Sequence, residues 1–181
     1  MTQRLKLKSM LYVALMAVVI AICSWITVPF TVPFTMQTFG VFAALIILGG
    51  RRGTLATALY ILLGCAGVPV FSGFNAGIAY ALGPTGGYMI GFLLAGLCYT
   101  ALEKPGEKSR LVRYMSLALG MLLCYVLGTL WFVGVYAARG TQYGLGKALT
   151  LCVLPFILPD AAKITLAVVV GSRLKRALPL V

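Results

Sequence analysis

Long apolar segments alternate along the chain with short polar or Gly/Pro-rich connections. A helix that crosses a lipid bilayer needs about 20 predominantly apolar residues. The second and third apolar segments fall short of that length, which favours a locally thinned bilayer or a compact bundle. The pattern predicts six spanning helices, at about 10–28, 38–50, 54–67, 86–102, 111–137 and 160–178, with a short helix at about 145–153 before the last.

The connections on one side of this bundle are short and basic. The segment 49–53 is expected to be a tight turn, because a single helix through it would bury Arg51 and Arg52 in lipid. The segment 103–110 is the most polar in the chain and is expected to be a loop.

The connection 28–39 contains the tetrapeptide Val-Pro-Phe-Thr twice in succession, at 28–31 and at 32–35. Proline disfavours helix both at its own position and at the residue before it. An extended, uncharged loop is therefore expected here, and it can offer apolar surface and hydrogen bonds to a ligand.

A second unusual connection, residues 68–88, holds five glycines and two prolines and carries no charge. Irregular backbone beside membrane spans is tolerated only where protein buries it or where it lines a cavity. This central run is interpreted as the wall or lid of a binding cavity, with a plain connecting loop as the alternative.

Composition narrows the class of protein. Hydrophobic residues make up 61% of the chain and charged residues 10%, whereas a soluble domain is about one quarter charged. The sequence therefore predicts an all-α integral membrane protein, a compact bundle of six transmembrane helices with a Gly/Pro-rich outer face, formed by a single domain over 1–181. The net charge of +12 comes from residues that flank apolar segments, so membrane lipid and not nucleic acid is the expected partner.

The basic residues also predict the orientation. All of the 15 Lys and Arg residues except Arg139, Lys147 and Lys163 lie at the two termini or in the segments 49–53 and 103–113. By the positive-inside rule, both termini are expected in the cytoplasm. The two Gly/Pro-rich connections and the start of the sixth helix then meet at the outer face.

The candidate site chemistry is carried by Asp160 and Lys163, at i and i+3 of the predicted sixth helix. Ionisable side chains within membrane spans are costly and are functional candidates by default. Asp can accept N–H donors and Lys can hold a carboxylate, so the pair suits a small molecule with an amide or urea at one end and an acid at the other. A structural ion pair is the alternative.

Enzymatic and cofactor chemistry are not expected. The sequence has no His, no Ser with a nearby base, no catalytic pair of carboxylates and no GxxxxGK[ST] motif. Its five cysteines are scattered singly, so neither a metal site nor a cofactor is predicted. What remains is an outward-facing binder without a motor of its own.

The first predicted helix carries small residues on one face, Ala14, Ala17 and Ala21. Small residues let another helix approach closely within lipid. The face is interpreted as a docking surface for a partner, with packing inside this chain as the alternative.

Four segments together resemble the BioY family, the biotin-specific substrate-binding (S) components of energy-coupling factor (ECF) transporters. They are Val32-Pro-Phe-Thr-Met-Gln-Thr38, Gly67-Val-Pro-Val-Phe71, Leu82-Gly-Pro-Thr-Gly-Gly-Tyr88 and Pro159-Asp-Ala-Ala-Lys163. The resemblance implies the S-component type of six-helix bundle, in a bacterial-type plasma membrane. It also implies biotin as the transported substrate, and a transmembrane coupling protein with two ABC-type ATPases as partners.

The resemblance further implies roles for individual residues. Asp160 would meet the ureido nitrogens of biotin and Lys163 its carboxylate, while the alanines of the first helix would dock on the coupling protein. The remaining implied pocket residues come from the closing loop after the first helix, the central run and the helix that follows it: Thr35, Gln37, Asn75, Tyr80 and Tyr88.

Two alternatives remain open at this stage. An S component for another vitamin would keep the fold and differ only in pocket residues. A membrane enzyme would need more polar residues inside the spans, and a channel would need a polar stripe along several of them.

Overall fold

The computed structural model describes residues 2–141 and 143–177. Helices dominate this part of the chain, joined by two 3-10 turns, Ser72–Phe74 and Leu154–Phe156, and by a pair of two-residue strands, Thr27–Val28 (β1) and Phe34–Thr35 (β2). The helices are Thr2–Trp25 (α1), Gln37–Leu48 (α2), Gly50–Cys65 (α3), Ile78–Ala81 (α4), Gly86–Lys108 (α5), Arg110–Ala138 (α6), Leu145–Cys152 (α7) and Ile157–Ala177 (α8).

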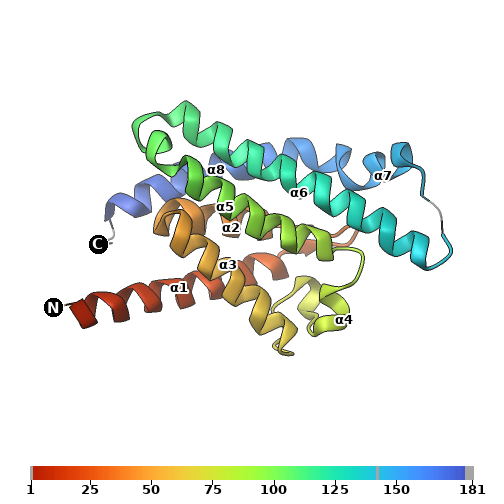
Figure 1. Ribbon diagram of the computed structural model, residues 1–181, viewed down its shortest axis with the longest axis horizontal. Helices are drawn as coiled ribbons and strands as arrows, with labels where there is room; N and C mark the ends of the chain where they lie inside the picture. Colours follow the sequence, from red (N-terminus) through yellow and green to blue (C-terminus); the bar gives the residue numbers. More distant parts are fainter. Residues whose placement is uncertain (1, 142, 178–181) are drawn as a thin grey trace.

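The longer helices α1, α2, α3, α5, α6 and α8 form a bundle, which confirms the predicted all-α membrane fold (Figure 1). Within the described ranges, four apolar helical segments are long enough to cross a membrane: Lys6–Trp25, Gly86–Lys104, Arg110–Ala138 and Leu145–Ala177. The last of these joins α7, the 3-10 turn and α8, so the short helix predicted before the sixth span continues almost directly into it.

Helix α2 is the centre of the bundle. It packs against α1, α3 and α8, and every residue in it except Phe39 is buried. A helix that is apolar on all sides belongs in an interior. Its shortness is therefore explained by compact packing, because protein rather than lipid surrounds it.

The connections sort to two ends of the bundle. The two termini lie at the same end as the α2–α3 and α5–α6 turns, and the β1–β2 hairpin, α4 and the α6–α7 connection lie at the other (Figure 1). The basic flanks found in the sequence therefore gather at one end, and the Gly/Pro-rich segments at the opposite end.

The turn expected over residues 49–53 is in fact a single residue. Gly49 has φ +83°, a conformation that glycine adopts readily, and α3 begins at once with Gly50. The carboxylate of Glu103 accepts the N–H of Gly50 at 3.0 Å, which satisfies one of the orphan donors of the α3 N-terminus. Helix α5 thus caps α3 and lets the turn be this short.

The prediction of a loop over residues 103–110 is wrong. Helix α5 continues to Lys108 and α6 starts at Arg110, so only Ser109 has extended backbone. The Ser109 hydroxyl accepts the N–H of Val112 at 3.5 Å and caps α6. Lys and Glu have high helix propensity, so a charged segment that leaves the lipid can remain helical.

The small-residue face of α1 packs largely within the chain. Ala17 and Ala21 are 2% and 3% exposed, and both belong to the main core. Helices α2 and α3 both pack against α1, and α2 comes so close that a Cβ on Gly40 would lie 3.2 Å from the Ile20 Cα. The burial of Ala17 and Ala21 inside the chain argues against a docking surface at these two positions, and of the three alanines only Ala14 is exposed.

Glycines set the close approach of α5 and α6. A Cβ on Gly91 would lie 2.7 Å from the Cys124 Cα, and one on Gly128 would lie 2.4 Å from the Tyr88 ring. Glycines at these positions let the two helices approach closely, which is how membrane helices gain packing contacts where lipid removes the hydrophobic driving force. The α5–α6 pair therefore depends on the absence of side chains at these positions.

Gly91→Ala is expected to lower the free energy of unfolding by about 1–3 kcal/mol, because the new methyl group meets helix backbone that cannot rotate away. The matched control is Gly134→Ala in α6, where a Cβ meets nothing within 4 Å. That variant should be neutral or stabilising by about 0.5–1 kcal/mol. Thermal unfolding in detergent measures both, and equal midpoints for the two variants would contradict the packing argument.

Candidate functional site

A pocket opens at the end of the bundle that carries the Gly/Pro-rich segments. Its free volume is about 60 Å³, several times the roughly 10–15 Å³ that one buried water requires. The hairpin and the start of α2, the central run, α5, α6, and the segment from the end of α7 into α8 all contribute to its wall.

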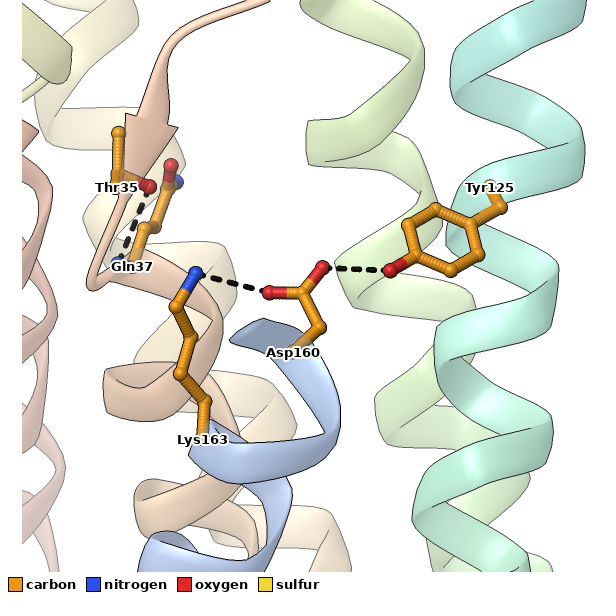
Figure 2. Close-up of polar contacts among 5 residues, drawn as sticks. All are labelled: Thr35, Gln37, Tyr125, Asp160 and Lys163. Atoms are coloured by element: carbon orange, nitrogen blue, oxygen red, sulfur yellow. Dashed lines mark hydrogen bonds and ion pairs between the residues drawn. The ribbon is translucent and has the colours of Figure 1, made fainter. Parts of the chain in front are cut away.

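The most polar part of the wall is an ion pair on the first turns of α8. Lys163 Nζ donates to Asp160 Oδ1 at 2.9 Å, and the two side chains are 6% and 5% exposed, respectively. The Tyr125 hydroxyl on α6 donates to the other carboxylate oxygen, Oδ2, at 2.7 Å (Figure 2). The positive end of the α8 dipole also favours a carboxylate in this position.

This pair retains capacity to bind a ligand. An ionised carboxylate offers about four acceptor directions and an ammonium three donors. Among the described residues, the contacts above use one direction on each carboxylate oxygen and one donor of Lys163. Both residues line the pocket, so the unused directions can serve a bound molecule.

The hairpin covers the pocket from the first Gly/Pro-rich connection. Its strands pair Thr27 with Thr35 and Val28 with Phe34. The Thr35 hydroxyl accepts the N–H of Gln37 at 3.2 Å, which anchors the hairpin to the start of α2 (Figure 2).

Gln37 belongs to the first turn of α2 rather than to the closing loop, where it was expected. Its side chain donates to the Tyr60 hydroxyl on α3 at 3.1 Å. This bond fixes the amide at the pocket wall.

The central run forms another part of the wall, in line with its interpretation as the wall of a cavity. Phe71 is fully buried and lies between two phenol rings, stacked on Tyr80 at 5.5 Å and edge-on to Tyr60 at 5.7 Å. A Cβ on Gly64 would collide with the Phe71 ring, so that glycine makes the room for it. Burial raises the pKa of the Tyr80 phenol above its ordinary value.

The structure brings most of the predicted site residues together. The pocket is lined by Thr35, Gln37, Tyr80, Tyr88, Asp160 and Lys163. Asn75 is the exception: it is exposed, and its side-chain amide donates to the Ser72 carbonyl at 2.7 Å within its own loop. The side chain is turned back on the central run and away from the pocket.

Sequence reasoning missed several wall residues. Tyr125 is the most important, and its signal was a lone phenol in the middle of an apolar span. Ser72, Thr38 and Thr85 add hydroxyls, and an apolar part of the wall consists of Met89, Phe92 and Met121. Tyr125 and the three apolar wall residues lie in helices α5 and α6, whose rotation about their own axes could not be read from nearly uniform apolar sequence.

Comparison with known proteins supplies independent evidence. The model of the BioY family matches residues 1–180. A protein of Pyrococcus horikoshii named "Probable biotin transporter BioY" is 40% identical over 172 residues, covering 94% of this chain and 98% of that protein. The "Biotin transporter BioY" of Thermotoga maritima is 32% identical over 171 residues, covering 94% of this chain and 97% of that protein.

A solved structure agrees with these relatives. The crystal structure of the S-component for biotin from an ECF-type ABC transporter superposes with a TM-score of 0.85. It is 29% identical in sequence, and the match covers 97% of this chain and 95% of that one. The family match over nearly the whole chain, the close relatives and the shared architecture agree, and this chain belongs to the BioY family.

Proposed function

We propose that this protein is the biotin-binding S component of an ECF-type vitamin uptake transporter. The observation that carries the proposal is the buried Asp160–Lys163 pair, which lines a pocket at the expected outer end of the bundle. Relatives named biotin transporters support biotin as the substrate.

The pocket offers partners for the separate groups of biotin. Because the ureido ring and the carboxylate stand at opposite ends of that molecule, contact with both ends requires the Asp160–Lys163 pair, which is 2.9 Å apart in the structure, to separate on binding. Burying the two ureido N–H donors without acceptors would cost about 1–3 kcal/mol each, and the Asp160 carboxylate has free acceptor directions. The Lys163 ammonium can take the ligand carboxylate, a charge-assisted contact roughly twice as strong as a neutral one. The apolar wall residues Met89, Phe92 and Met121 suit the remaining carbon and sulfur atoms.

Transport then requires a motor from elsewhere. The sequence has no P-loop motif, so ATP hydrolysis falls to partners, which we propose are a transmembrane coupling protein and two ABC-type ATPases. The structural match to an S component of such a transporter supports this assignment. Both termini face the cytoplasm in this proposal, which leaves the pocket open to the outer side.

Asp160→Asn is expected to weaken biotin binding by about 10- to 100-fold, because hydrogen bonds to charged groups contribute roughly 1.5–3 kcal/mol. The matched control is Thr85→Val, which removes a neutral hydroxyl from the same pocket and should weaken binding by less than about 10-fold. Titration calorimetry of the purified protein measures both, against a wild type that binds biotin. A wild type that binds no biotin would refute the proposed function.

Lys163→Ala is expected to weaken biotin binding by about 10-fold or more, because a charge-assisted contact is lost. It should matter much less for biotinamide, in which the carboxylate is capped and no longer charged. The same calorimetry compares the two ligands, and thermal unfolding without ligand provides the control. Equal losses for both ligands, together with a lower unfolding midpoint, would instead identify a structural ion pair.

The orientation is tested by labelling cysteines introduced into a variant that lacks the native ones. A reagent that cannot cross membranes should modify Thr141→Cys from outside intact cells and should leave Lys104→Cys unmodified, because the positive-inside rule places the basic end in the cytoplasm. Both positions are exposed on the protein surface, so a difference in labelling reports the side of the membrane and not burial within the protein. Labelling of Lys104→Cys alone would reverse the orientation and close the pocket to the outside.

A further inference from the structure

The two copies of Val-Pro-Phe-Thr face in opposite directions. In the first copy, Val28 and Phe30 are 50% and 67% exposed. In the second copy, Val32 is 6% exposed and packs in a cluster with Phe132 and Phe156. The same tetrapeptide therefore occurs once on the surface and once partly buried, and only the second, inner copy reaches the site.

The inner phenylalanine, Phe34, lies against the charged group of the pocket. The Lys163 ammonium stands 3.9 Å from the centre of its ring, well within the roughly 6 Å limit of a cation–π contact. Phe34 also stacks with Phe156, with the ring centres 6.2 Å apart and an interplanar angle of 24°. The ring is therefore held in place rather than free to turn.

These contacts leave the ammonium with one direction for a ligand. Of its three donors, one is taken by Asp160 and one is covered by the face of Phe34. Because Lys163 is only 5% exposed, bulk water does not replace either contact. A cation–π contact is also strongest when the cation is desolvated.

We propose that Phe34 is a positioning residue that selects for a carboxylate on the ligand, by holding the Lys163 ammonium dehydrated and directed into the pocket. The proposal rests on the proposed function and deepens it, since it assigns the acid specificity of the site to a residue of the hairpin. Without the ring, water or Asp160 takes the second donor, and the ammonium must be desolvated or reoriented each time an acid binds.

The test compares biotin with biotinamide by calorimetry on the full-length protein in detergent. Phe34→Leu keeps an apolar side chain but removes the ring, and it is expected to weaken biotin binding by about 2- to 30-fold, the range that a cation–π contact supports. Binding of biotinamide should be weakened by a clearly smaller factor than binding of biotin, because the uncharged amide does not need the ammonium. Phe34→Tyr, which keeps the face of the ring, should retain the wild-type preference for biotin over biotinamide.

The chain provides a matched control in its own repeat. Phe30→Leu makes the same change in the same tetrapeptide at the exposed copy, and it should leave binding of both ligands unchanged. If Phe34→Leu proves too unstable to purify, 3,4,5-trifluorophenylalanine at position 34 keeps the size of the ring and weakens its negative face. That protein should show the same selective loss of biotin affinity.

Three results would overturn the inference. Equal losses for biotin and biotinamide would show that Phe34 only packs the hairpin. An unchanged biotin affinity in Phe34→Leu or in the trifluorophenylalanine protein would show that the ring does not act on Lys163. A wild type that binds neither ligand would refute both the proposed function and this inference. If the wild type binds biotin but the Phe34 variants lose no more affinity for biotin than for biotinamide, only the inference is refuted.

Discussion

The structure at the pocket depends on one constraint, the burial of an ion pair at the start of a membrane helix. Charges removed from water are tolerated only when their geometry and hydrogen bonds compensate for the lost hydration. Asp160 meets this requirement through Lys163 and Tyr125, and Lys163 meets it through Asp160 and the ring of Phe34. These contacts connect helices α6 and α8 and the hairpin at the ion pair.

The two ends of the bundle solve different problems. At the end with the termini, the connections shrink to Gly49 and Ser109, and Glu103 caps the start of α3. At the opposite end, the chain uses the hairpin, the central run and α4, whose backbone is irregular but held by side-chain contacts such as the stacking of Phe71 on Tyr80. A rigid closed end thus supports an end that is built to contain a cavity.

Aromatic residues link the separate parts of the pocket wall. Tyr60 receives the hydrogen bond of Gln37 and packs edge-on against Phe71, which joins the start of α2 to the central run. On the other side, Phe34 stacks with Phe156 and joins the hairpin to the approach to α8. Large planar side chains suit this role, because they bury much apolar surface and, in tyrosine, also carry a polar group.

The sequence by itself determined the class of the protein, the approximate spans, the clustering of basic residues and the candidate pair at positions 160 and 163. These are properties of composition, hydropathy and helical spacing, which act locally along the chain. Most of the other predicted pocket residues also came together, because the family motifs lie in the segments that meet at one end of the bundle.

Tertiary structure alone decided which face of each helix turns inward. Ala17 and Ala21 are buried inside the chain instead of lying on an exposed face, Asn75 bonds within its own loop, and Tyr125 lines the pocket without a motif to mark it. In spans that are apolar on nearly every side, hydropathy carries little information about rotation. The rotation of each helix is then set by the close contacts at glycines and by the hydrogen bonds of its polar side chains. Both depend on segments that are far apart in the chain.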